Sequence, residues 1–336
     1  MRSQLDIDQQ AQLSKLTVEH GLSEKLQELL AIGKSCVQLA GLGPDRLEKV
    51  GDCRLGGLPD VPSDFVWPGK MSFIAQLNLS AISPLAPAGL LPAQGMLYFF
   101  LGDDEAPDNL PIAVIHADAT MGELRRAVAP DGYVEVTSQE YDSGDANVIY
   151  EPYALTTARC VSLPSYGSPL FWKVLGDIPT KMVTDAYFAI GDALGIQIPS
   201  RRIGRHQLFG YAIAADRDPA VLACYKRHGV HSDFYWLERP RLEKLILELE
   251  SQSERSRHDE YLLKKRREQL EELMRCGPRE ELKQEAEQDW VLLLELDSDL
   301  NAGMCFWDAG HIQFMIHERD LRERRFDRVL AFLFTS

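Results

Sequence analysis

The stretch that decides the fold covers residues 290–316, WVLLLELDSDLNAGMCFWDAGHIQFMI. Two apolar runs flank an acidic turn, and Gly310 precedes the second run. A fainter copy occupies residues 71–101, where SFIAQLNLS is followed by a longer loop and then by GMLYFFL, with Gly95 in the corresponding place. Short apolar runs bounded by turn residues predict paired β-strands.

Alternation of apolar and polar residues supports the strand assignment in the first copy. A strand over FIAQLNL is expected to place four apolar side chains on one face, those of Phe73, Ala75, Leu77 and Leu79. The runs VLLLEL and MLYFFL are apolar almost throughout, which is typical of strands covered on both faces.

The two copies match at several positions in the same order. Gln76 aligns with Glu295, and upstream the glycine turn at Gly57 aligns with the turn at Gly210. Between the turn and the strand pair, the second copy is longer by about the length of the charged segment 219–289. We therefore expect a duplicated antiparallel β module whose second copy carries an insertion.

The inserted segment is rich in Glu, Lys, Arg and Leu, which favours solvated helices. Two apolar stripes recur at helical spacing, one from Leu242, Leu245, Ile246 and Leu249 and one from Leu262, Leu263, Leu270 and Leu273. The polar residues between the stripes are consistent with a helical hairpin or with one solvated helix. Whether the helices of 238–288 pack within the chain or against another chain stays open.

These patterns together predict an α+β, mainly β protein. Its body is expected to be a duplicated antiparallel β module, roll-like and two-lobed, with N-terminal helices and a helical insertion in the second half. The expected division is an N-terminal helical segment at 1–34, a first β repeat at 35–165, and a second β repeat at 166–336 carrying the insertion at about 219–289. Thr180 is expected to cap a helix over KMVTDAYFAIGDAL.

Charge and composition exclude several function classes. The net charge of −15 over 336 residues opposes phosphate backbones and anionic lipids, so we expect neither nucleic acid nor membrane as a partner. No apolar run approaches the ~20 residues of a membrane span, and the first residues lack the apolar core of a secretory signal. Six scattered cysteines without a CxxC pair predict reduced thiols, hence a cytoplasmic protein.

One group of motifs resembles a known family. RLGGLPDVP at 54–62 followed by WP at 67–68, the turn GRHQLFGY, and FWDAGHIQFMIHERDL are similar to the YwqG-like family, a bacterial domain of unknown function. The resemblance implies a duplicated, predominantly β roll with peripheral helices and no established activity. Some members lie beside toxin genes, which implies an immunity-like or partner-binding role. Phe209 and Ala212 depart from the glycine and proline common in the His-containing turn of that family.

Nucleophilic catalysis has few candidates in this chain. There is no G-x-S-x-G elbow and no phosphate-cradling glycine loop. His206 is the candidate base, with Asp308 as the carboxylate that orients it, if the two repeats face each other. The sequence leaves open whether the protein is an enzyme.

The most metal-like spacing is Cys224-x3-His228-x2-His231-x-Asp233. Zinc binds thiolate, imidazole and carboxylate at such spacings. The stretch also reads as the end of a short helix stopped by Gly229, where a histidine interacts favourably with the helix dipole. We therefore expect no metal and no other cofactor, with these four residues as the candidates if one binds.

Trp67, Trp172 and Trp307 are candidates to line a groove between the two lobes and anchor a partner; the alternative for each is core packing or pinning of a loop. Trp67 is expected to pin its loop to the core, with a loop carbonyl accepting from the indole N–H. The binding candidates are Arg54, Trp67, Trp172, His206 and Trp307. The first hypothesis is a noncatalytic binding or protein-interaction module, with its partner on the helical insertion or in a cleft between the lobes. The alternative is a hydrolase-like enzyme that uses His206 as base with a nearby carboxylate.

Overall fold

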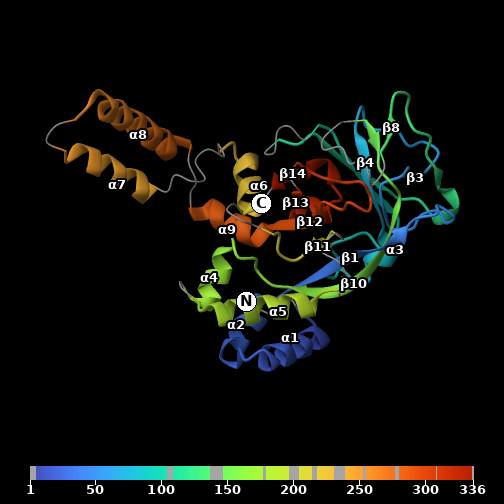
Figure 1. The fold of residues 1–336 in the computed structure, drawn as a ribbon. Coiled ribbons are helices and arrows are strands. Elements are labelled where there is room, and N and C mark those ends of the chain that lie inside the picture. The colour runs from blue at the N-terminus through green and yellow to red at the C-terminus, as the bar shows by residue number, and fades with distance from the viewer. Residues whose placement is uncertain are drawn as a thin grey trace. The chain divides into compact units, whose positions relative to one another are not determined.

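The structure is a computed structural model of the chain (Figure 1). It describes residues 5–103, 109–136, 147–176, 179–196, 204–213, 218–230, 239–252, 255–276, 280–307 and 309–334. The chain divides into two units, the first formed by Met1–Asp216 with Val291–Ser336 and the second by Arg217–Trp290. The helical insertion expected from the sequence covers about 219–289.

A ten-stranded sheet forms the body of the first unit, in the order β14-β13-β12-β11-β1-β10-β2-β4-β5-β6. Its strands are β1 (Lys34–Pro44), β2 (Arg54–Leu55), β4 (Ser72–Asn78), β5 (Met96–Leu101), β6 (Ile112–Ala117), β10 (Tyr153–Ser162), β11 (His206–Phe209), β12 (Trp290–Asp297), β13 (His311–His317) and β14 (Leu330–Phe334). Two short sheets pair β3 (Asp60–Val61) with β7 (Arg125–Arg126) and β8 (Val134–Glu135) with β9 (Val148–Ile149). The expected α+β class with a strand-rich body is confirmed.

The centre of the sheet joins the two halves of the chain. β1 and β10 pair antiparallel from Lys34↔Ser162 to Pro44↔Tyr153. β10 also pairs with β2 of the same half, whereas β1 pairs with β11, which belongs to the second half of the chain. The ten-stranded sheet therefore contains strands of both expected repeats.

The sheet curls until strands near its two edges share one core. The rings of Phe99 on β5 and Phe314 on β13 meet edge to face, with centroids 5.1 Å apart. Both belong to a large apolar cluster that also takes residues from β1, β2, β4, β11, β12 and β14. β5 is buried along its whole length, as its continuous apolar sequence predicts.

One strand-face prediction was wrong. Phe73 does not share a face with Ala75 and Leu77, because the β4–β5 register shifts between Phe73 and Ala75. An extra residue in one strand reverses the alternation of side chains beyond it. Phe73 therefore packs with Tyr98 in an aromatic layer on the other face, while Ala75 and Leu77 enter the large cluster.

Helices gather beside β1 and β10 (Figure 1). α1 (Ile7–Glu19) begins at a capping box of Asp6 and Gln9, and α5 (Lys181–Leu194) begins at the expected cap Thr180. α2 (Leu26–Ile32) and α4 (Pro169–Leu175) complete this apolar layer. The remaining short helices of this unit are η1 (Ser23–Lys25), α3 (Leu79–Ile82), η2 (Met121–Glu123), α10 (Glu318–Arg322) and η4 (Phe326–Arg328).

The second unit is helical. It contains α6 (Pro219–Arg227), α7 (Arg239–Glu250), α8 (Arg257–Cys276) and α9 (Glu280–Asp289), with α6 packed on α9 and α7 on α8. Leu242 and Ile246 of α7 and Leu263 of α8 are buried. The two leucine-rich helices thus cover each other in this chain, while Leu247 and Tyr261 stay exposed.

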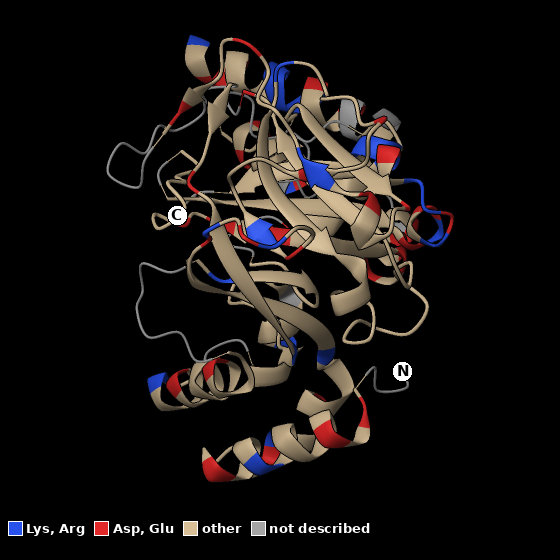
Figure 2. Cartoon of the chain, turned by 90° about the vertical axis from the view of Figure 1, so that its right-hand side faces the viewer, with Lys and Arg blue, Asp and Glu red and all other residues tan. Residues whose placement is uncertain are grey.

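Figure 2 shows acidic and basic residues interspersed along the ribbon of the described part of the chain. Among the described helices, none combines the length and the apolar character needed to cross a membrane.

We predict that replacing residues 219–289 by a flexible Gly/Ser linker of about 15 residues, which spans roughly 20 Å, leaves the first unit folded. The three apolar clusters of the sheet and its helices consist entirely of first-unit residues. Cooperative thermal unfolding and a dispersed NMR amide spectrum would check this. Deleting β10 is the control and should abolish folding; a linker variant that unfolds without cooperativity contradicts the division.

Candidate functional site

His206 lies at the start of β11 and is buried, with 1% of its surface exposed. Its Nδ1 accepts from the backbone N–H of Asp297 at 3.2 Å. Its Nε2 lies 3.4 Å from Oδ2 of Asp299. Because Nδ1 accepts, the proton of the neutral ring belongs on Nε2, where it is directed at the Asp299 carboxylate. Both ring nitrogens therefore have partners inside the protein.

Asp299 is the carboxylate beside His206. Sequence reasoning named Asp308 for this place, but Asp308 lies outside the described residues. Burial opposes ionisation of Asp299, yet the hydrogen bond from His206 and those from Asn301 hold its pKa below the ordinary value. Its oxygens also accept from the backbone of Asn301 at 2.9 Å and of Gly204 at 3.2 Å. The His206–Asp299 pair thus joins β11 to the loop that follows β12.

That loop covers residues 298–310 and is closed by hydrogen bonds at both ends. Ser298 donates through its N–H and its Oγ to the carbonyl of Gly310, at 3.0 and 2.6 Å. Inside the loop, the backbone φ is +49° at Trp307 and +55° at Ala309. A bulky residue with positive φ is an outlier. Trp307 is nevertheless 41% exposed, so the loop presents an indole to solvent.

A second buried polar cluster lies next to His206 along the chain. Glu295 is fully buried on β12, opposite Gln207 of β11 in the strand register. It accepts from the side chains of Gln207 at 2.9 Å and Gln313 at 2.7 Å and from the Ile213 N–H at 3.0 Å. Burial raises its pKa, while these donors act in the opposite direction. The cluster connects β11, β12 and β13.

Arg54, a candidate binding residue, is enclosed rather than presented to solvent. Its guanidinium donates to the Leu58 carbonyl at 2.6 Å and to carboxylate oxygens of Asp45 and Asp60 at 3.3 Å each. Asp60 is buried too and accepts from Arg126 Nε at 2.6 Å. Burial lowers the pKa of Arg54, and the two carboxylates act against that effect. This network fixes the loop between β2 and β4.

The three tryptophan candidates have separate surroundings. Trp67 donates to the Met71 carbonyl at 2.9 Å, which confirms the predicted loop pin, and its ring packs on the aromatic layer of the sheet. Trp172 packs against Tyr166 and Phe171 among the helices. Trp307 stands exposed on its loop. The structure does not gather the three indoles into one groove.

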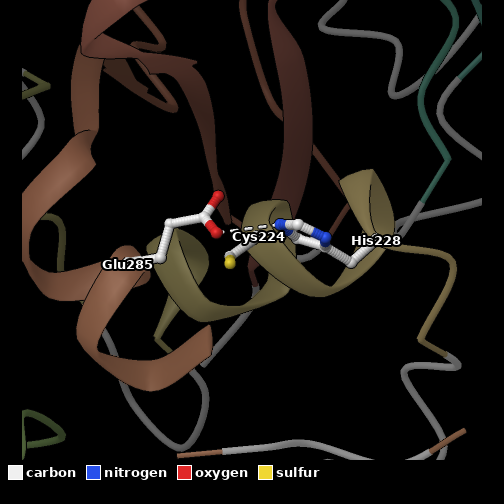
Figure 3. A group of neighbouring side chains, drawn as sticks. All are labelled: Cys224, His228 and Glu285. Carbon is white, nitrogen blue, oxygen red and sulfur yellow. Dashed lines mark hydrogen bonds and ion pairs between the residues drawn. The ribbon is translucent and has the colours of Figure 1, made fainter. Parts of the chain in front are cut away.

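Two of the four metal candidates, Cys224 and His228, lie close together in the second unit. Figure 3 shows Cys224 and His228 on α6 and at its end, facing Glu285 of the neighbouring helix α9. His231 and Asp233 lie outside the described residues. Sequence reasoning missed Glu285, because it follows 57 residues after His228 and only the packing of α9 on α6 brings it near. The one usable signal was the i, i+4 spacing of Cys224 and His228.

Comparison with known proteins places the chain in a broad context. The sequence profile of a family described as "Domain of unknown function (DUF1963)" matches residues 53–333. No curated protein matches this chain. The matched range includes β2, His206, the 298–310 loop and the whole second unit.

We predict that Asp60→Asn lowers the free energy of unfolding at pH 7 by about 3–5 kcal/mol, because Arg54 would keep its buried charge with one carboxylate fewer. Burial opposes ionisation of Asp60, but the charge of Arg54 and hydrogen bonds from Gly51 and Gln76 hold its pKa below the ordinary value. Such a group stabilises the fold above its unfolded pKa of about 4 and loses that contribution as the pH falls through the folded pKa.

Urea unfolding at a series of pH values checks this prediction. The wild type should lose stability as the pH falls below about 4, and the Asp60→Asn curve should be flatter there. The exposed Asp64 supplies the matched control, Asp64→Asn, which should follow the wild type. Equal stability of the Asp60 and Asp64 variants at pH 7 would show that the network contributes nothing.

Proposed function

The chain belongs to the DUF1963 family, which is defined by a domain of unknown function. Since the family supplies no function, we propose one from the geometry of the chain itself. The proposal is a noncatalytic protein-interaction module that binds a protein partner through the 298–310 loop, with Trp307 as the anchor. We further propose the finer YwqG-like kinship, an immunity-like role and a cytoplasmic location, supported by the motifs and by the composition of the chain.

The observation that carries the proposal is that Trp307 combines a strained backbone with a solvent-exposed indole. A left-handed backbone costs an L-residue about 1–2 kcal/mol. Trp307 adopts it at φ +49° while keeping 41% of its surface exposed. Strained residues persist where the surroundings enforce them, and they concentrate at functional positions. Tryptophan is also one of the residue types enriched among the energetic anchors of protein interfaces.

The surroundings of the loop supply the rigidity that recognition needs. Asp299 is held by His206 from β11, and Phe306 donates from its backbone to Ser298 Oγ at 3.0 Å. Gly310 donates in turn to the Phe306 carbonyl at 2.8 Å. A loop ordered before binding loses less conformational entropy when a partner binds. His206 thus supports recognition as a positioning residue, without contacting the partner.

We also infer that the β body is a duplicated module. Supporting this, Leu79 donates to the Gly95 carbonyl at 3.0 Å and Ser298 donates to the Gly310 carbonyl at 3.0 Å, a matching bond after β4 and after β12. Two consecutive positive φ values follow β2 and recur at the end of β11. Under this inference, the loop bearing Trp307 is the second copy of a loop that contains α3 in the first copy.

A hydrolase-like enzyme with His206 as base remains the alternative, and the His206–Asp299 pair is the observation that favours it. A general base must reach the proton of its substrate. His206 is 1% exposed, and its second nitrogen already accepts from the backbone of Asp297. Both features support a positioning role over a catalytic one.

We predict that a photoreactive phenylalanine in place of Trp307 forms a discrete crosslink to one protein in the native cell. Unmodified wild-type protein should compete with that crosslink, and Trp307→Gly should not. Tyr166, 55% exposed among the helices, is the control position and should not give the same adduct. The proposal fails if position 307 gives no adduct or gives the same products as position 166.

The same position tests the strain directly. Trp307→Gly should be more stable than Trp307→Ala by about 1 kcal/mol, because only glycine accepts positive φ without cost. In an unstrained backbone the alanine variant would be the more stable of the two. Thermal or urea unfolding of the two purified variants measures the difference.

His206→Gln separates the two hypotheses. If His206 positions the loop, the variant should speed amide hydrogen exchange across 298–310 and weaken the Trp307 crosslink, because Asp299 loses its contact with the ring that joins it to β11. The exposed His258 gives the matched control, His258→Gln, which should change neither readout. Unchanged exchange in the loop of His206→Gln would remove the positioning role.

A further inference from the structure

The second unit holds a cluster of three side chains with different ligand atoms. α6 places Cys224 and His228 one helical turn apart, and Glu285 of α9 faces both (Figure 3). One ligand atom from each residue lies within 4.8 Å of the other two. His228 Nε2 and Glu285 Oε2 are 2.9 Å apart. We propose that these three residues bind a zinc ion, with a water molecule as the fourth ligand.

The donor set and its spacing fit zinc. Zinc takes sulfur at about 2.3 Å and nitrogen or oxygen at about 2.0–2.2 Å in tetrahedral geometry. Such distances set neighbouring ligand atoms about 3.3–3.7 Å apart. The ligand atoms of the cluster are therefore within about 1 Å of that spacing. Magnesium and calcium prefer oxygen ligands and do not suit a site that includes a thiolate.

Zinc binds cysteine as the thiolate, so its binding displaces the thiol proton. Without a metal ion, Cys224 Sγ donates to the Leu282 carbonyl at 3.3 Å. With zinc bound, the Cys224 thiolate and the Glu285 carboxylate balance the two positive charges of the ion.

The three residues differ in their exposure to solvent. Cys224 is buried, while the side chains of His228 and Glu285 are 35% and 23% exposed. Because two ligands come from α6 and one from α9, the ion ties these two helices together. The inference is independent of the proposed function, since the Trp307 loop belongs to the first unit.

An ordinary ion pair between His228 and Glu285 is the competing explanation. It explains the 2.9 Å contact between His228 and Glu285 but does not involve Cys224. The two explanations differ in their response to removal of the sulfur. Under the zinc proposal Cys224→Ser loses most of the affinity, whereas under the ion-pair explanation no specific binding exists to lose.

The test uses the full chain, stripped of metal with a chelator and titrated with Zn²⁺ and with Co²⁺ as its spectroscopic substitute. We expect one equivalent to bind, with a thiolate-to-cobalt charge-transfer band and the visible absorption of tetrahedral cobalt. Calorimetry at pH 7 in buffers of different ionisation enthalpy should report about one proton released per ion, from Cys224. Mg²⁺ should not compete.

Variants assign the ligands. Cys224→Ser should lower zinc affinity at least about 100-fold and abolish both the charge-transfer band and the proton release. His228→Gln and Glu285→Gln should each lower affinity by about 10–100-fold. The controls Cys305→Ser, His258→Gln and Glu287→Gln change residues of the same types outside the cluster and should bind as the wild type does.

The outcomes that overturn the proposal are equally direct. Binding no tighter than that of the Cys224→Ser variant, or cobalt absorption without a thiolate band, removes the site. If Cys224→Ser unfolds, His228→Gln decides, because its side chain is part exposed and its loss leaves the helix packing in place. Zinc should also slow hydrogen exchange in α6 and α9 of the wild type and leave that of His228→Gln unchanged.

Discussion

The antiparallel pairing of β1 with β10 is the constraint on which the rest of the structure depends. It joins residues far apart in the chain, from Lys34↔Ser162 to Pro44↔Tyr153, and each partner carries a further strand on its outer edge. Through β11 the pairing fixes where His206 lies, and through β12 it fixes the start of the 298–310 loop. An exposed feature of the surface thus takes its position from the centre of the sheet.

Buried polar groups help to set the register of this apolar sheet. Glu295 accepts from Gln207, from Gln313 and from the Ile213 N–H, and Asp60 accepts from Arg54 and Arg126. A slip of one residue would break such contacts, at a cost of about 1–3 kcal/mol for each neutral group and more for charged ones. The same slip would turn apolar side chains to the other face of the sheet, so the polar clusters and the apolar pattern favour one register.

Local patterns in the sequence predicted local structure well. Continuous apolar runs predicted β5, and Thr180 predicted the start of α5. Three features depended on pairing between distant segments and were out of reach: the shift after Phe73, the carboxylate beside His206, and the position of Glu285. The apolar pattern indicates which strands exist, but the order of the strands follows from pairing across the whole sheet, which no single run of residues determines.

Two other non-glycine residues with positive φ have a compensation that Trp307 lacks in full. Phe209 has the same strained backbone at φ +63°, yet its ring is buried. Burying an aromatic ring contributes about 1.5–3 kcal/mol, which offsets a strain of about 1–2 kcal/mol. Arg324 follows α10, where a left-handed residue commonly ends a helix. Trp307 has neither compensation in full, since it is 41% exposed and lies in no helix end. Folding alone therefore leaves part of its strain unbalanced, and burial of the exposed ring by a partner is the interaction that would balance it.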